Sequence, residues 1–175
     1  MIYLTPLHTD DLPALLAFEL ANRAYFEANI NARPAAFYSE LGVREAIASA
    51  VREACADKAY SYLIRDNAGL LIGRINLTRV RRAHYQSAEL GYRIAESETG
   101  KGYAKEAVRL MLFQAAEAHD LVRLEATARP ENLGSTRVLL YNGFTQFGRS
   151  TQSFEMGGTW YDLVHFERRL HRPEG

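Results

Sequence analysis

Residues 87–117 read SAELGYRIAESETGKGYAKEAVRLMLFQAAE, and this stretch decides the fold. Its first part, SAELGYRIA (87–95), alternates polar and apolar side chains as a strand does. A loop at 96–99 leads to two glycines, Gly100 and Gly102, and then to apolar side chains at helical spacing. These are Ala104, Ala107, Val108, Met111, Leu112 and Ala115. The stretch therefore predicts a strand, a glycine turn and an amphipathic helix in direct succession.

Strands are predicted on both sides of this stretch. The two segments before it, AYSYLIRD (59–66) and LLIGRINLTRV (70–80), form an antiparallel meander with SAELGYRIA, because only turns separate them. The segment LVRLEATA (121–128) follows the helix, and a strand, a crossover helix and a second strand require one parallel pairing. A short helix at 133–141 and a hairpin with strands at 144–151 and 160–169 come next.

The amino-terminal part predicts a strand at 2–5 and two helices. The first helix begins at about Asp10, with Thr9 as its cap, and the second runs from about Glu40 to Ala56. Together the segments predict a mixed α+β fold. Its central sheet is mostly antiparallel with one parallel crossover, and helices cover both faces.

Length and charge limit the class of protein. The chain has 175 residues with 21 basic and 21 acidic side chains, so we expect one domain at 1–175, and the overall charge favours neither nucleic acid nor membrane as a partner. Pro6 and the acidic pair Asp10 and Asp11 interrupt the apolar block that a secretory signal needs, so we expect Met1 onward to be mature protein. A single cysteine fits a reducing compartment, so we expect the cytoplasm. Cys55 is the only cysteine, and the histidines at 8, 84, 119, 165 and 171 lack metal-ligand spacing, so no metal is expected.

The glycine turn suits a phosphate group. The first amides of a helix have no partner within the helix and lie at the positive end of its dipole, so the turn can bind a pyrophosphate, with Lys101 as a nearby cation. A dinucleotide-binding turn would need Gly or Ala where Lys105 stands, and a P-loop would need Ser or Thr after Lys101. Both are excluded. The alternative that the two glycines only let the chain turn stays open.

Three separate motifs resemble those of a known family. SAELGYRI, GKGYAKEA and RPENLGSTRVLLYNGF together are similar to the GNAT superfamily of acyl-CoA-dependent N-acetyltransferases, and within it to the RimJ/RimL-like branch. The resemblance implies a GNAT fold with a splayed sheet and acetyl-CoA as cosubstrate. It also implies that the backbone of Tyr92, Arg93 and Ile94 pairs with the pantetheine arm. The pyrophosphate would then lie on the amides of Gly100, Lys101, Gly102, Tyr103 and Ala104.

The same resemblance implies catalytic candidates. Asn132 would contact the pantetheine or a bound water, and Ser135 would contact the coenzyme one turn later. Many family members carry a tyrosine where this chain has Leu139, so Ser135 is the candidate to hydrogen-bond the thioester sulfur, against a purely helix-stabilising role. Glu89 is the candidate general base, against a solvated strand glutamate, and Glu155 is a second choice.

The chemistry of thioester attack favours one class of acceptor. At pH 7 an α-amino group of pKa near 8 is about 10 % neutral, whereas a lysine of pKa near 10.4 is about 0.04 % neutral. We therefore expect an N-acetyltransferase acting directly on a protein amino terminus, without Cys55 as a covalent relay. Either a monomer or a homodimer is compatible with the sequence.

Two alternatives remain at this stage. One is a small-amine or antibiotic-amine acetyltransferase. The other is an acyl-CoA-binding module with little catalysis that contacts RNA or protein through the basic cluster Arg79, Arg81, Arg82 and His84. A solvated hairpin tip explains the same cluster more simply, so nucleic acid is not the expected partner.

Overall fold

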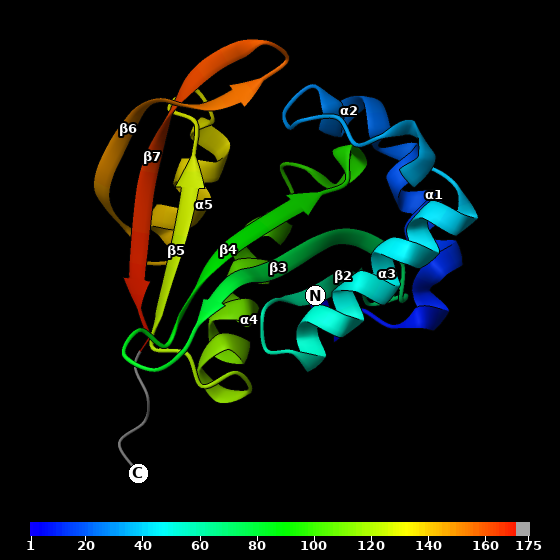
Figure 1. The fold of residues 1–175 in the computed structure, drawn as a ribbon, viewed down its shortest axis with the longest axis horizontal. Helices are drawn as coiled ribbons and strands as arrows, with labels where there is room; N and C mark the ends of the chain where they lie inside the picture. The colour runs from blue at the N-terminus through cyan, green and yellow to red at the C-terminus, as the bar shows by residue number, and fades with distance from the viewer. Residues whose placement is uncertain (171–175) are drawn as a thin grey trace.

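The computed structural model describes residues 1–170, which form one seven-stranded sheet in the order β1-β2-β3-β4-β5-β7-β6 (Figure 1). The strands are β1 (Ile2–Pro6), β2 (Tyr60–Asp66), β3 (Leu71–Arg81), β4 (Ser87–Ile94), β5 (Arg123–Ala128), β6 (Thr145–Met156) and β7 (Thr159–Arg169). The main helices are α1 (Leu12–Ala21), α2 (Arg23–Glu27), α3 (Glu40–Cys55), α4 (Tyr103–Glu117) and α5 (Leu133–Tyr141). The predicted mixed α+β fold is confirmed.

The pairing of β4 with β5 is the parallel step in this sheet, and it is short. It joins residues 87–89 of β4 to residues 123–125 of β5, whereas all other strand pairs among residues 1–170 are antiparallel. Beyond Glu89, β4 continues to pair with β3 as far as Ile94, and β5 continues to pair with β7 as far as Ala128. The two central strands therefore separate after three pairs, which confirms the predicted splayed sheet.

Side chains that alternate along the strands divide between two apolar clusters, one on each face of the sheet. Ile64, Leu90 and Leu124 pack with α4 and α5 in the larger cluster. Leu63 and Leu71 pack with α1, α2 and α3 in the smaller one. Figure 1 shows the same division, with helices on both faces as predicted. No helix within residues 1–170 is both long and apolar enough to span a membrane.

The start of the first helix differs from the prediction. Residues 9–11 form a 3-10 turn, and α1 begins only at Leu12. The cap of this turn is His8 rather than Thr9, because the His8 side chain accepts a hydrogen bond from the Asp10 amide at 3.3 Å and the Asp11 carboxylate accepts one from the His8 amide at 2.8 Å. This reciprocal arrangement satisfies two amides at the helix end, which a threonine cap alone would not do.

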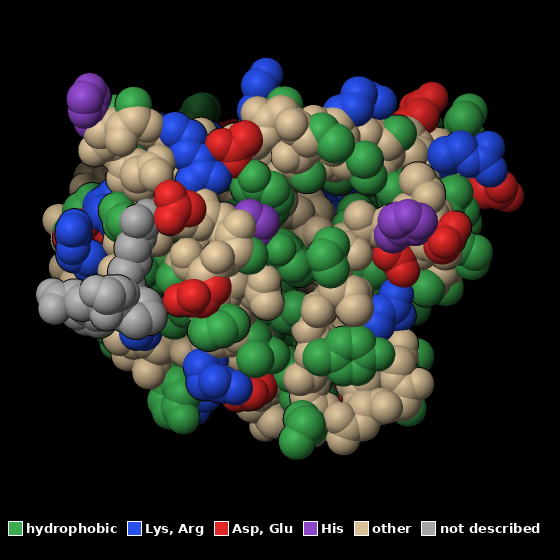
Figure 2. Space-filling view, turned by 90° about the horizontal axis from the view of Figure 1, so that it is seen from below, with side chains coloured by type: hydrophobic (Ala, Val, Ile, Leu, Met, Phe, Trp, Pro, Cys, Tyr) green, Lys and Arg blue, Asp and Glu red, His purple; other side chains and the backbone are tan. Residues whose placement is uncertain are grey.

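The β3–β4 turn is held by a charge pair that the hairpin-tip interpretation missed. Arg82 donates two hydrogen bonds of 2.6 Å to Asp57 and one of 2.7 Å to the His119 carbonyl, so it is half-buried, while Arg79, Arg81 and His84 are exposed. Figure 2 shows basic and acidic side chains mixed across the face of the molecule that is seen from below. Arg79 also pairs with Glu89 at 3.1 Å, so two arginines of the cluster have carboxylate partners.

The Asp57 pair predicts a pH-dependent contribution to stability. Hydrogen bonds from Arg82 and Tyr60 lower the pKa of Asp57 to about 2, below its unfolded value of about 3.9. The stabilisation is therefore complete above about pH 4 and is lost as the pH falls through about 2. Asp57→Asn should lower Tm at pH 7 by about 1 to 3 °C, because exposed ion pairs contribute at most about 1 kcal/mol.

Thermal unfolding between pH 7 and pH 2 checks this expectation, with Glu45→Gln on the exposed side of α3 as the charge-matched control. The difference in Tm between the wild type and Asp57→Asn should become smaller below pH 4. A difference that stays constant down to pH 2 would contradict the assigned pKa.

Candidate active site

The glycine turn presents the amino end of α4 without any side chain over it. Gly100 and Gly102 both adopt left-handed backbone, with φ of 76° and 82°, which only glycine adopts without strain. Gly102 is the cap of α4 and supplies no side-chain hydrogen bond, so the amides that follow, at Tyr103 and Ala104, are available to an anion. A Cβ built on either glycine would meet no atom of the described chain within 4 Å.

Lys101 stands between the two glycines, and its charge is already paired. Its Nζ lies 2.9 Å from Oε2 of Glu98, in the 3-10 turn that precedes the glycines. Half of the Lys101 side chain remains exposed. Because this pair is at the surface, water screens it, and Lys101 can exchange Glu98 for a more highly charged phosphate.

The side chain of Tyr92 meets Ser135 on the α4 and α5 side of the sheet. The two hydroxyl oxygens are 3.1 Å apart, and Tyr92 packs against the larger apolar cluster, as do Leu139 and the buried Ile94. Burial raises the pKa of the Tyr92 phenol, so it keeps its proton at neutral pH. Two linked hydroxyls thus lie on the side of β4 that faces α5.

Asn132 takes part in the fold of α5 itself. It caps that helix, with its Oδ1 accepting a hydrogen bond of 3.0 Å from the Ser135 amide. The same residue therefore holds the first turn of α5, in which Ser135 lies. Asn132 is exposed and Ser135 is half-buried, so both can be reached from outside.

The opposite side of β4 carries Glu89, Gly91 and Arg93. Leu90, Tyr92 and Ile94 face the larger cluster, so the alternating residues face the side of α1 and α2. Glu89 is half-buried and lies 3.1 Å from a nitrogen of Arg79. Gly91 is exposed, and a Cβ there would meet no described atom within 4 Å. Open space therefore lies above Gly91, next to the point where β4 and β5 separate.

The β6–β7 hairpin reaches the same side of the molecule. The Asn31 side chain, after α2, donates a hydrogen bond of 2.9 Å to the Glu155 carbonyl near the end of β6. The Glu155 carboxylate accepts a hydrogen bond from the Gly158 amide in its own hairpin. This second candidate base is thus engaged in the turn, whereas Glu89 lies at the separation of the strands.

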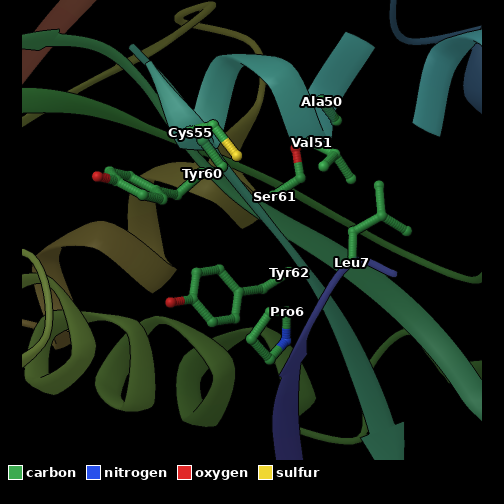
Figure 3. Close-up of a pocket in the computed structure, with 9 residues that line it drawn as sticks. Pro6, Leu7, Ala50, Val51, Cys55, Tyr60, Ser61 and Tyr62 are labelled. Carbon is green, nitrogen blue, oxygen red and sulfur yellow. The ribbon is translucent and has the colours of Figure 1, made fainter. Parts of the chain in front are cut away.

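A separate hollow lies at the other end of the molecule (Figure 3). Apolar side chains of α3, β1 and β2 dominate its lining, together with Cys55 and Tyr60. Another lining residue, Tyr62, hydrogen-bonds His119, just past the carboxyl end of α4. A helix of 15 residues is about 22 Å long, so this hollow lies far from the glycine turn. Cys55, which lines this hollow, is therefore remote from the glycine turn.

The described residues contain no cluster of three or more His, Cys, Asp or Glu side chains that could hold a metal ion. His171 lies outside the described residues. The absence of a metal requirement stays a prediction.

Sequence reasoning assigned Tyr92 a backbone role only and missed its hydroxyl. The signal was present in the alternation of β4, which places Tyr92 on the same side as Leu90. A helix at 133–141 with a buried Leu139 turns Ser135 toward that side, since the two residues are one turn apart. Their contact still depends on how α5 packs against the sheet.

Comparisons with known proteins identify the family. The model of the acetyltransferase (GNAT) domain matches residues 2–145. The Bacillus subtilis (strain 168) protein named "Probable N-acetyltransferase YjcK" is 33 % identical over 162 residues, which are 92 % of this chain and 90 % of that protein. The Escherichia coli (strain K12) ribosomal-protein-serine acetyltransferase is 32 % identical over 100 residues, 57 % of this chain and 55 % of its own.

Solved structures agree. RimJ from Mycobacterium smegmatis, in complex with CoA-disulfide, superposes with a TM-score of 0.88 at 26 % identity and covers 96 % of this chain and 81 % of its own. Ribosomal-protein-S5-alanine acetyltransferase from Vibrio fischeri has a TM-score of 0.91 at 21 % identity, covering 97 % and 93 %. The chain belongs to the GNAT acetyltransferase family and is an N-acetyltransferase similar to the RimJ/RimL branch, which confirms the predicted resemblance.

Proposed function

We propose that this N-acetyltransferase transfers acetyl from acetyl-CoA to the α-amine at a protein amino terminus, acting as one domain in the cytoplasm. The observation that carries the proposal is the separation of β4 from β5, in the strand that leads through the glycine turn to the open amino end of α4. The similarity to a ribosomal-protein-serine acetyltransferase and to RimJ supports the acceptor class.

The coenzyme would bind along two adjoining surfaces. Its pyrophosphate would accept hydrogen bonds from the amides of residues 100–104, at the positive end of α4. Its pantetheine arm would pair with the β4 edge at Tyr92, Arg93 and Ile94, since β4 has left β5 by that point. Backbone groups that lack a strand partner would thereby gain one. The amide side chain of Asn132 would border the same arm.

The acyl end would then lie near Gly91, between two sets of polar groups. On one side, Ser135 and Tyr92 would hydrogen-bond the sulfur and supply a proton as the C–S bond breaks. On the other side, the neutral amine would attack the thioester carbonyl carbon and give up its proton, directly or through water, to Glu89. The amine approaches over Gly91 because that position has no side chain.

An acceptor screen tests the proposed function. Release of free CoA is measured with amino-terminal peptides, polyamines and aminoglycosides at equal concentration. Peptides with a free α-amine should give the highest kcat/KM, and peptides blocked at the amino terminus should give none. Turnover with polyamines or aminoglycosides alone would establish the small-amine alternative. Acetyl-CoA binding without turnover of any acceptor would establish the binding module.

Gly102→Glu should lower the affinity for acetyl-CoA by about 100-fold or more, because it places a carboxylate at the site of the phosphates. Gly69→Glu is the matched control: Gly69 has φ of 83° against 82° for Gly102, so the backbone strain is equal, and it lies in the β2–β3 turn. Calorimetric titration of both folded variants checks this. Equal affinity in the two variants would refute the pyrophosphate site.

Ser135→Ala should lower kcat about tenfold or more while the Kd for acetyl-CoA changes less than about twofold, since the hydroxyl acts on the leaving sulfur. Tyr92→Phe should lower kcat less than Ser135→Ala does. Because the two hydroxyls are hydrogen-bonded to each other, the double variant should lower kcat by less than the product of the two single reductions. Thr136→Ala removes a hydroxyl from the next position of α5 and serves as control. A Ser135→Ala rate equal to that of the control would exclude Ser135 from the mechanism.

A further inference from the structure

Helix α1 carries a buried carboxylate, Glu19, that is surrounded by arginines. Glu19 is 1 % exposed, and its oxygens lie 2.6 Å from Arg74, 3.2 Å from Arg33 and 3.9 Å from Arg93. These residues come from α1, β3, β4 and the segment after α2, so the fold rather than local sequence brings them together. Each arginine keeps a fraction of its side chain in contact with solvent, between 12 % and 25 %.

The charges in this cluster do not balance. Three guanidinium groups against one carboxylate leave two positive charges in excess among the described residues. Arg74 and Arg93 are also directly opposite each other in the β3–β4 register, where like charges repel. Burial, with added repulsion from Arg33, lowers the pKa of Arg93 to about 10. The buried Nε of Arg74 has no hydrogen-bond partner in the described chain.

The cluster adjoins the position proposed for the acceptor amine. Arg93 follows Gly91 by two residues on the same side of β4, a distance of about 7 Å along a strand. The ring of Phe26 in α2 lies against the Arg93 guanidinium at 5.1 Å, and that of Phe37 lies against Arg33 at 4.2 Å. Both guanidinium groups are thus held in place by packing, and Arg93 lies on the same face of β4 as the open position at Gly91.

We propose that Arg33, Arg74 and Arg93 form a subsite for a carboxylate of the acceptor, so that the enzyme selects amines that carry a negative charge within two or three residues. This inference rests on the proposed function and adds a substrate class to it. A second or third residue of a bound peptide lies about 4 to 8 Å from the first, which matches the separation of Gly91 and Arg93. The excess positive charge would repel a polyamine.

A neighbouring arginine shows what a purely structural role looks like. Arg23 packs over the Tyr38 ring at 4.0 Å, as Arg33 packs over Phe37, but Arg23 has its own carboxylate, Glu27, at 2.9 Å. Arg33 shares Glu19 with two other arginines. The pair Arg23 and Arg33 therefore provides a matched control within one segment of the chain.

The test compares peptides that differ only in charge. Amidated peptides with the same first residue carry Asp or Asn at the second or third position, and a dipeptide is offered as its free acid and as its amide. Acetylation gives kcat and KM, and calorimetric binding in the presence of CoA gives Kd. For the wild-type enzyme, KM and Kd should be about tenfold or more lower for the charged member of each pair than for the neutral one.

Arg33→Gln should reduce this preference to less than about threefold, whereas Arg23→Gln should keep the preference. A preference for Asp peptides identifies a side-chain carboxylate as the ligand, and one for the free-acid dipeptide identifies the terminal carboxylate. Equal KM and Kd for charged and neutral peptides, or a preference that survives Arg33→Gln, would overturn the subsite. Failure to acetylate either member of every pair would instead overturn the proposed acceptor class.

Discussion

The short parallel contact between β4 and β5 is the constraint on which the rest of the site depends. Only residues 87–89 pair with residues 123–125, although both strands run on for several residues in the described chain. Peptide groups along the separated edges need hydrogen-bond partners from solvent or from a ligand. An extended chain such as a pantetheine arm can supply them. The amino end of α4, at the end of the same strand, continues this surface with free amides.

The two sides of β4 divide the chemistry between them. The α5 side brings Ser135 to Tyr92, where a leaving sulfur would need a proton. The other side carries Glu89, the open position at Gly91 and the arginines around Glu19, where an amine and its neighbouring groups would bind. Because successive strand residues point to opposite faces, the proposed proton donor and the proposed general base lie on opposite faces of one strand. The apolar clusters on both faces keep β4 in this position.

Most of the fold could be predicted from the sequence, because local periodicity and turn residues determine it. The helix at 133–141 and the strand–turn–helix that ends in α4 are in the structure as predicted. The site was harder to predict from the sequence than the fold. The phosphate role of the glycine turn followed from the unpartnered amides at a helix start as well as from the family resemblance, whereas the roles of Asn132 and Ser135 came from the resemblance alone. All of them stay predictions. The Glu19 cluster, the Tyr92 hydroxyl and the burial of Arg82 depend on contacts between residues far apart in the chain, which no local pattern encodes.

A crystal structure of the protein with CoA would test this arrangement most directly. We expect the pyrophosphate on the amides of residues 100–104, the pantetheine beside residues 92–94 of β4, and the sulfur within hydrogen-bonding distance of Ser135. CoA bound elsewhere on the molecule, or β4 and β5 paired along their full length in the complex, would contradict it.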